Sequence, residues 1–198
     1  VSDSFGLNVR EVCVCGVCEY KMPVHRYTKC FHMVTTAMWL REWGASGPGV
    51  EAEELLKRAH ESETRECPKC KEERHFASRV TLARAPQHFS MHLVVPRGHC
   101  NAEMIRAVLD LVPLTLDLSK MLGGFEDRPG GGPRYRLRCI MCYYNRHCVL
   151  VAFKPRIKRW VQFDDAKVEA LGDWDQVKHR MAEGKVIPIV TFYEMYDA

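Results

Sequence analysis

The chain has 198 residues, of which 46% are hydrophobic and 27% are charged, and its net charge is +4. This balance is typical of a soluble globular protein, and it excludes a disordered or collagen-like chain. The small positive charge does not by itself indicate nucleic-acid binding. No apolar run approaches the roughly 18 residues that a membrane span requires. Because residue 1 is a valine and no signal-peptide pattern follows it, we expect a piece of a longer protein that does not bind membranes.

Hydrophobic alternation and turn residues predict more strands than helices. Helices are expected over residues 50–62, 101–111 and 174–182. Strands are expected over residues 76–84, 88–95, 135–144, 148–154, 157–163 and 186–193. Glycine-rich loops are expected at 44–49 and 123–133. Since strands and helices do not alternate along the chain, the pattern favours an α+β fold around a mostly antiparallel sheet.

Ten cysteines are present, and six of them form three Cys-x-x-Cys pairs. In the absence of a secretory signal, such close pairs favour a metal site over disulfides, and they indicate a reducing compartment, the cytoplasm or the nucleus. Isolated cysteines and tryptophans are expected in the core: Cys30, Cys100, Trp39, Trp43, Trp160 and Trp174.

Two of the pairs, Cys15 with Cys18 and Cys67 with Cys70, predict a four-thiolate zinc site. Two residues between the thiols place both sulfurs on one side of a tight turn, and two such turns complete a tetrahedron. Cys13 is an alternative ligand to Cys15, and free thiols in a reduced core are the alternative to a metal. Because four thiolates leave no open position for a substrate, the expected role of the zinc is structural.

The third pair, Cys139 and Cys142, lies inside a predicted strand without turn residues. Positions three apart on a strand face opposite sides, so free thiols are the favoured interpretation of this pair.

A histidine and an aspartate near the C-terminus form a second candidate site. A hairpin that turns near residues 155–156 brings His147 opposite the neighbourhood of Asp164. We expect the carboxylate to accept the Nδ1 proton of the imidazole, which leaves Nε2 to deprotonate a nucleophile. Without further context, the same two residues are also typical of the exposed surface of a hairpin.

The order of these motifs resembles the C-terminal two-thirds of the ubiquitin-specific proteases, the papain-like deubiquitinases that are built as fingers, palm and thumb. The resemblance covers roughly residues 10–196. It is carried by the two Cys-x-x-Cys turns at 15–18 and 67–70, here called the knuckles, and after them by residues 83–93, 114–118, 135–147, 159–168 and 188–193. It implies a single partial domain over residues 1–198, with a zinc-bearing fingers region at 10–95 and a palm at 96–198.

The resemblance also implies roles for individual residues. Cys15, Cys18, Cys67 and Cys70 match the zinc ligands at the tip of the fingers. His147 matches the catalytic base, Asp164 the residue that orients it, and Asp165 a neighbouring acidic position. The channel for the ubiquitin C-terminal tail is matched by Tyr143, Tyr144, Asn145, Arg146 and Cys148. The implied partner is ubiquitin or a ubiquitin-like protein, and the implied reaction is thiol-dependent hydrolysis of an isopeptide bond.

Three positions depart from the family pattern. No cysteine precedes Cys13, so the nucleophile box of the family is absent. Cys148 replaces an aromatic residue that lines the tail channel, and Asn145 and Arg146 stand where the family commonly has a glycine. We therefore expect this chain to be inactive alone, with a nucleophile supplied by an upstream segment or a companion chain.

Two alternatives remain at this stage. The first is a catalytically inactive member, kept as a ubiquitin-binding or scaffolding subunit of a larger assembly. The second, less favoured, is a zinc-knuckle protein that binds nucleic acid through a basic stripe on its strands. That stripe consists of Arg134, Arg136, Arg138, Arg146, Lys154, Arg156, Lys158 and Arg159.

Overall fold

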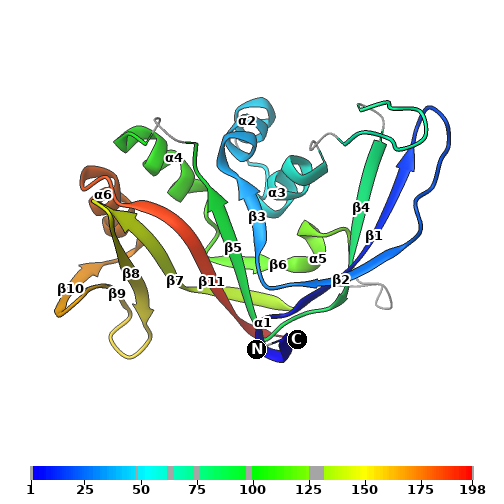
Figure 1. Cartoon of the computed structure of the whole chain (residues 1–198). Helices are drawn as coiled ribbons and strands as arrows, with labels where there is room; N and C mark the ends of the chain where they lie inside the picture. Colours follow the sequence, from blue (N-terminus) through cyan, green and yellow to red (C-terminus); the bar gives the residue numbers. More distant parts are fainter. Residues whose placement is uncertain are drawn as a thin grey trace.

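The computed structural model describes residues 2–47, 49–61, 65–73, 76–96, 100–124 and 132–197, and within them the strands form two sheets. The smaller, antiparallel sheet has the order β2-β1-β4 and consists of β1 (Leu7–Cys15), β2 (His25–Lys29) and β4 (Phe76–Arg84). In Figure 1 it projects away from the rest of the molecule as a long ribbon.

The larger sheet has the order β10-β9-β8-β7-β11-β5-β3, and β6 pairs with β7 beside this path. Its strands are β3 (His32–Thr35), β5 (His88–Val94), β6 (Thr115–Asp117), β7 (Arg134–Tyr144), β8 (His147–Lys154), β9 (Arg159–Asp164), β10 (Lys167–Gly172) and β11 (Ile187–Asp197). All pairings are antiparallel except that of β3 with β5. The mostly antiparallel α+β architecture predicted from the sequence is therefore confirmed.

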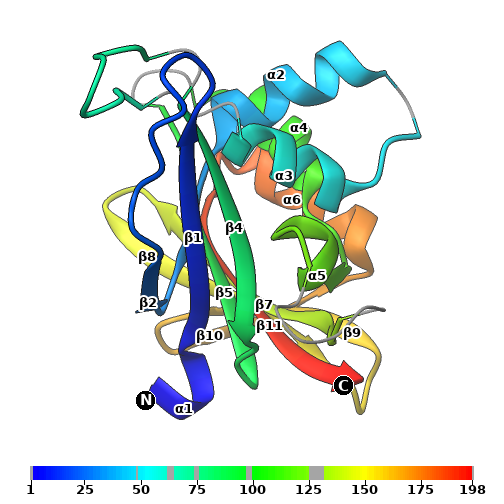
Figure 2. The same cartoon turned by 90° about the vertical axis from the view of Figure 1, so that its right-hand side faces the viewer.

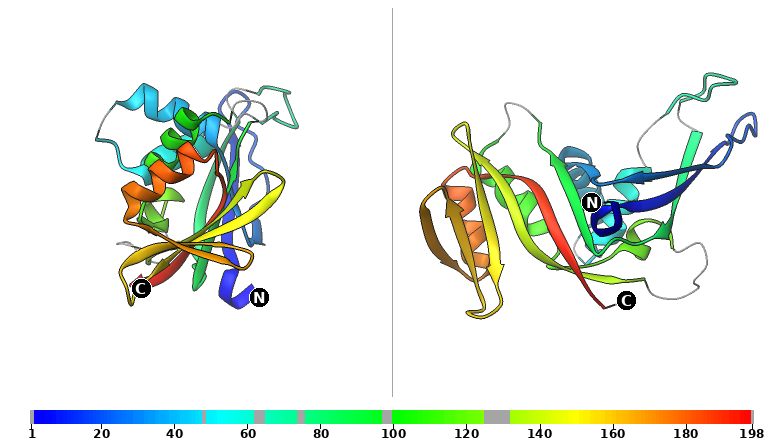
Figure 3. Two further views of the ribbon diagram at one scale, coloured as in Figure 1. Left: turned by 90° about the vertical axis from the view of Figure 1, so that its left-hand side faces the viewer. Right: turned by 60° about the horizontal axis from the view of Figure 1, so that its bottom comes forward.

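The helices lie mostly on one side of the sheets, with α1 apart from the others at the N-terminus, as Figure 2 and the left view of Figure 3 show. They are α1 (Ser2–Phe5), α2 (Thr36–Ser46), α3 (Ala52–Glu61), α4 (Ala102–Leu111), α5 (Leu118–Met121) and α6 (Trp174–Glu183). Helices α4 and α6 pack against each other, α6 also contacts β10 and α4 contacts β11, and Val108, Val177 and Val149 are buried in the same hydrophobic core. None of the described helices is long and apolar enough to span a membrane.

The predicted helices are confirmed with small shifts at their ends, and their caps explain the boundaries. Asn101 accepts a hydrogen bond from the backbone of Met104 at the start of α4. Asp173 and Gln176 form a reciprocal capping box at the start of α6. The sequence did not predict α2, whose preceding residue, Thr35, makes no side-chain cap hydrogen bond.

Several strands also escaped prediction, namely β1, β2, β3, β6 and β10. Strand β9 begins at Arg159 and not at residue 157 as expected, because Lys158 adopts a positive φ of 51° in the turn before it. The expected 123–133 loop lies partly outside the described residues.

Of the six residues predicted for the core, two are buried and two, Trp174 and Cys100, are partly buried. Trp39 and Trp160 are buried, and Trp160 packs against Trp174 with 5.1 Å between the ring centroids. Two predictions are wrong: Trp43 is 47% exposed on α2, and Cys30 is exposed next to the edge strand β3. Cys100 is only partly buried.

A buried histidine lies at the start of β3. The ring of His32 faces His60 of α3 and Phe89 of β5, and its Nδ1 accepts a hydrogen bond from Lys29 Nζ at 3.1 Å. Desolvation lowers the pKa of His32 well below 6.5, and the nearby positive charge of Lys29 and the His60 ring lower it further. The folded chain therefore holds His32 neutral.

The neutral state of His32 predicts a loss of stability in mild acid. Below pH 6.5 the unfolded chain binds a proton that the folded chain excludes, so the free energy of unfolding falls by at most about 1.4 kcal/mol per pH unit. Denaturant unfolding between pH 7.5 and 5 measures this slope. His32→Leu should flatten it, whereas His92→Gln, at an exposed histidine, should leave it unchanged. An unchanged slope in His32→Leu would show that another group causes the acid sensitivity.

Candidate functional site

The four cysteines of the first two pairs converge at the far end of the smaller sheet. Cys15 Sγ lies 3.6 Å from Cys70 Sγ, and Cys18 Sγ lies 3.7 Å from Cys67 Sγ. All four sulfurs lie within 4.8 Å of one another. A tetrahedral zinc ion bonded at about 2.3 Å places its sulfurs about 3.8 Å apart. The cluster can therefore hold a metal ion with little rearrangement.

Backbone amides of the first knuckle favour a thiolate at Cys15. Hydrogen bonds from the backbone of Cys18 and Val17 outweigh desolvation and lower the pKa of the Cys15 thiol to about 6, whereas burial and the neighbouring thiols raise the pKa of Cys70 to about 12. Since only the thiolate binds a metal, this lowered pKa prepares the ligand at neutral pH. Cys13, the alternative ligand, is buried beside the cluster and is not among its four members.

An ion pair between a buried carboxylate and an exposed arginine joins the segments that carry the knuckles, and it was not predicted from the sequence. Glu11 of β1 accepts hydrogen bonds from Arg65 Nη1 at 2.7 Å and from Ser78 Oγ of β4 at 2.5 Å. Only 8% of Glu11 is exposed, and it occupies an inward position in the alternating burial pattern of β1. Glu11 follows Leu7 and Val9 at every second position of β1. A charged residue at such an inward position indicates a buried partner, and this pattern could have been read from the sequence.

The histidine and the aspartate of the second site are brought together by two tight turns. Asn145 and Arg146 form a two-residue turn with φ of 46° and 65°, the left-handed conformation that type I′ hairpins require. This turn places His147 at the first position of β8. Asp164 ends β9, and Asp165, with φ of 50°, begins the turn into β10.

The contact between the two side chains is close. His147 Nε2 lies 2.7 Å from Asp164 Oδ1 and 3.8 Å from Asp165 Oδ2. The side chains of His147 and Asp164 are 37% and 34% exposed, whereas that of Asp165 is 85% exposed. The prediction that the hairpin brings His147 to Asp164 is therefore confirmed.

The nitrogen that meets the carboxylate is Nε2, and the sequence-based expectation of Nδ1 is wrong. Asp164 ends the neighbouring strand β9, and the ring nitrogen within hydrogen-bond distance of its oxygen is Nε2. With a proton on Nε2 held by Asp164, Nδ1 carries the free lone pair. Any base chemistry of His147 therefore proceeds through Nδ1.

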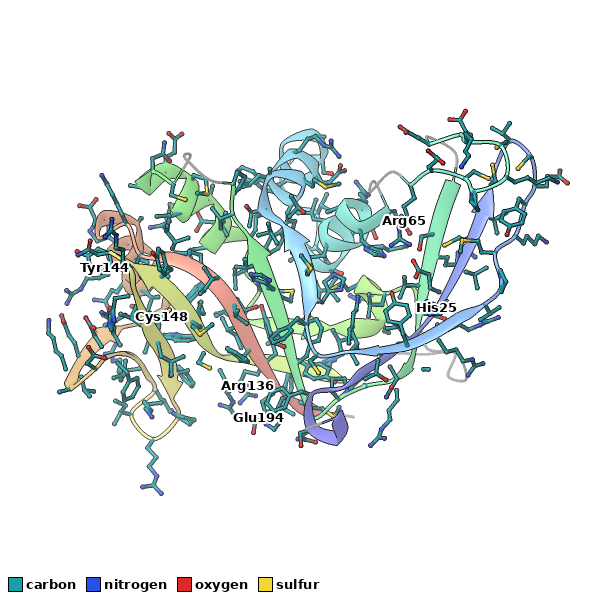
Figure 4. All side chains as sticks on the ribbon, in the orientation of Figure 1. His25, Arg65, Arg136, Tyr144, Cys148 and Glu194 are labelled. Atoms are coloured by element: carbon teal, nitrogen blue, oxygen red, sulfur yellow. The ribbon has the colours of Figure 1, made fainter. Side chains whose placement is uncertain are left out.

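The five residues predicted for the tail channel do not lie on one face of the sheet. Tyr144 pairs with His147, and Tyr143 pairs with Cys148. Since neighbouring strand residues alternate, Cys148 and Tyr143 lie on the face opposite to His147. Figure 4 shows Tyr144 and Cys148 at the end of the β7–β8 hairpin. Among the described residues, no thiol joins the cluster of His147 with the two aspartates.

The third pair behaves as its strand position predicts. Cys142 is buried and Cys139 is partly buried, both on β7. Desolvation raises the pKa of both thiols, so they stay protonated at neutral pH.

Part of the basic stripe is engaged in contacts within the chain. Arg138 Nε donates to Glu194 Oε2 at 2.6 Å, and the guanidinium of Arg136 lies 4.7 Å from the ring centroid of Tyr196. Arg136 and Glu194 are neighbours near the C-terminal end of β11 in Figure 4. The ion pair with Glu194 offsets the charge of Arg138, one of the charges that the nucleic-acid alternative requires.

The fold is that of the ubiquitin-specific proteases, with the smaller sheet as fingers and the larger sheet as palm. A solved structure with this fold is the SAGA Ubp8/Sgf11/Sus1/Sgf73 DUB module bound to ubiquitin aldehyde, with a TM-score of 0.59, 12% identity, and coverage of 100% of this chain and 43% of that chain. The yeast SAGA DUB module with a mutant Sgf73 gives a TM-score of 0.59 and 12% identity over 99% of this chain and 42% of that chain.

Two curated relatives resemble the chain in sequence. Ubiquitin carboxyl-terminal hydrolase 54 of Rattus norvegicus is 25% identical over 197 residues, which cover 96% of this chain and 12% of the relative. Ubiquitin carboxyl-terminal hydrolase 53 of Homo sapiens is 25% identical over 202 residues, which cover 98% of this chain and 18% of the relative. The chain thus spans less than a fifth of either relative. No protein-family model matches the chain.

The Glu11 ion pair leads to a test of how the fingers are held together. Desolvation raises the pKa of Glu11, but the Ser78 hydroxyl and the Arg65 charge outweigh it, and the net pKa lies below 4.5. Glu11 therefore stabilises the fold above pH 4.5, and this contribution is lost as the pH falls through the lowered value. At pH 7 we expect Glu11→Ala to cost about 1–3 kcal/mol in denaturant unfolding.

The matched control is Glu66→Ala, which removes the exposed ion pair with Lys71. We expect it to cost less than about 1 kcal/mol. Equal losses in the two variants would show that the burial of Glu11 adds nothing.

Proposed function

We propose that this chain is the fingers and palm part of a ubiquitin-specific cysteine protease domain, whose nucleophile lies on an upstream segment or a companion chain. The observation that carries the proposal is the 2.7 Å contact between His147 Nε2 and Asp164 Oδ1 at the edge of the palm. A relic without function has no need to hold this pair in hydrogen-bonding geometry. In this proposal residues 1–198 act as one partial domain in a reducing compartment, the cytoplasm or the nucleus.

The chemistry follows from the orientation of the imidazole. Asp164 holds the Nε2 proton, and Asp165 adds a second negative charge 3.8 Å from the same nitrogen. Nδ1 accepts the proton of a cysteine thiol supplied from outside the described residues, and the thiolate attacks the isopeptide carbonyl. His147 then returns the proton to the leaving amine, and water hydrolyses the thioester.

Ubiquitin or a ubiquitin-like protein is the proposed partner. The support is the likeness in fold to a DUB module described as bound to ubiquitin aldehyde, together with the sequence likeness to ubiquitin hydrolases. In the proposal Tyr144 contacts the tail on the face of His147, while Tyr143, Asn145, Arg146 and Cys148 flank the hairpin end.

The second candidate function is a catalytically inactive ubiquitin-binding or scaffolding subunit. Two observations favour it: the two-residue turn at Asn145 and Arg146 leaves no longer loop to cover a substrate tail, and Cys148 is exposed on the opposite face. A thiol-reactive ubiquitin probe separates the two functions.

The probe should be applied to the native protein in its full natural context. We expect a covalent adduct between the protein, or its companion chain, and a ubiquitin whose C-terminus carries a thiol-reactive group. His147→Ala should reduce the rate of adduct formation by about 100-fold or more, because the thiol loses its base. His179→Ala, at an exposed histidine on α6, is the matched control and should react at the normal rate. No adduct in the native protein would exclude the enzyme and favour the binding subunit.

For the metal we propose zinc with a structural role, bound by Cys15, Cys18, Cys67 and Cys70. The sulfur separations near 3.7 Å and the all-thiolate donor set fit zinc. When bound, the ion offsets two of the four thiolate charges and crosslinks the tips of the fingers.

Metal analysis tests this assignment. We expect one zinc ion per chain after gel filtration, and its loss in Cys67→Ser. Strong chelation should unfold the fingers and lower the melting temperature, because the energy of metal binding is part of the energy of folding. Cys139→Ser is the matched control and should keep the ion. A chain that is equally stable with and without zinc would contradict a structural role.

A further inference from the structure

The side chains of His147, Asp164 and Asp165, at the ends of β8 and β9, also have the composition of a metal centre. One imidazole nitrogen and two carboxylate oxygens, from His147, Asp164 and Asp165, lie within 4.8 Å of one another. The same nitrogen, Nε2, faces both carboxylates, at 2.7 Å and 3.8 Å. In the part of the chain that the structure describes, this is the only such group besides the four cysteines.

The separations suit a first-row divalent cation. Ligands bonded at about 2.1 Å to one zinc ion lie about 3.0 to 3.4 Å apart. The His147 to Asp164 distance needs to open by a few tenths of an ångström, and the Asp165 distance needs to close by a similar amount. Asp165 can make that movement at low cost, because its side chain is 85% exposed.

The donor set also selects the type of ion. Imidazole favours zinc, copper, nickel and iron, whereas magnesium and calcium prefer oxygen ligands alone. Both turns at this edge are only two residues long, and His147 and Asp164 are each about one-third exposed. Water therefore has room to complete the coordination sphere.

We propose that His147 Nε2, Asp164 and Asp165 form a second, exposed zinc site, distinct from the four-cysteine cluster. The ion takes the place of the proton between His147 and Asp164, so the metal-bound chain cannot hold the base in its proton-accepting arrangement. The site does not depend on the proposed function, since zinc binding at these side chains requires no nucleophile. If the protein is an enzyme, however, zinc acts as its reversible inhibitor.

Calorimetric titration of Zn²⁺ into the full-length protein, with its cysteine cluster already loaded, tests the proposal. We expect one further equivalent to bind, and no heat from Mg²⁺ at the same concentration. His147→Ala should abolish this equivalent. Asp165→Asn should weaken it by more than the roughly tenfold that loss of an outer-shell partner costs.

The matched control is Glu183→Gln, which neutralises an exposed acidic residue at the end of α6. It should bind the second equivalent as tightly as the unmodified protein. Amide chemical shifts recorded during the titration should move at residues 145–148 and 164–166, and they identify the site independently of the variants.

Two results would overturn the proposal. One is the absence of a second equivalent, and the other is a second equivalent that survives both His147→Ala and Asp165→Asn. Failure of the proposed function gives a different pattern, namely zinc binding at this edge without any adduct to the ubiquitin probe.

Discussion

The pairing of β7, β8 and β9 through short connections is the constraint on which the candidate site depends. The two-residue turn at Asn145 and Arg146 fixes the register of β7 with β8, and the pairing of Leu150 with Phe163 fixes β8 against β9. A shift of one residue would move every side chain of β8 to the other face of the sheet. Val149 would then leave the hydrophobic core, and His147 would leave Asp164. Burial of the apolar face therefore also fixes the geometry of the polar pair.

The sequence predicted those parts of the fold whose signal is local. Cys-x-x-Cys spacing identified the sulfur cluster, because two turns and four thiols leave few other arrangements. Alternation identified the β7–β8 region, and Asn101 marked the start of α4 through its cap hydrogen bond. Helix α2 was missed since its start lacks such a cap, and Trp43 was assigned to the core since nothing local distinguishes it from Trp39. Burial depends on which elements pack together, and a short stretch of sequence does not specify that packing.

The candidate site shows the same division. That His147 meets Asp164 follows from the hairpin, but the sequence does not specify which ring nitrogen makes the contact. The Glu11 ion pair joins residues separated by 54 and 67 positions, and its partners could not be chosen from the sequence. Both cases concern polar groups whose partners lie on other elements. One apolar residue can often replace another in the core, whereas a hydrogen bond requires a particular donor and a particular acceptor. Polar partners are therefore harder to predict from the sequence than core positions.

The parallel pairing of β3 with β5 has a consequence for the way the chain folds. His32 pairs with Met91, so the chain between them must close a long loop before the edge of the palm forms. The contact of Cys15 with Cys70 spans 55 residues and lies partly inside the same interval. A metal ion that joins the knuckles first shortens the path that β3 and β5 have to close. The gain in stability is modest, since halving a loop saves only about 0.6 kcal/mol. The order of events matters more, because non-local pairings of this kind limit folding rates. The knuckles at the tip of the fingers thus help to determine how quickly the distant palm is completed.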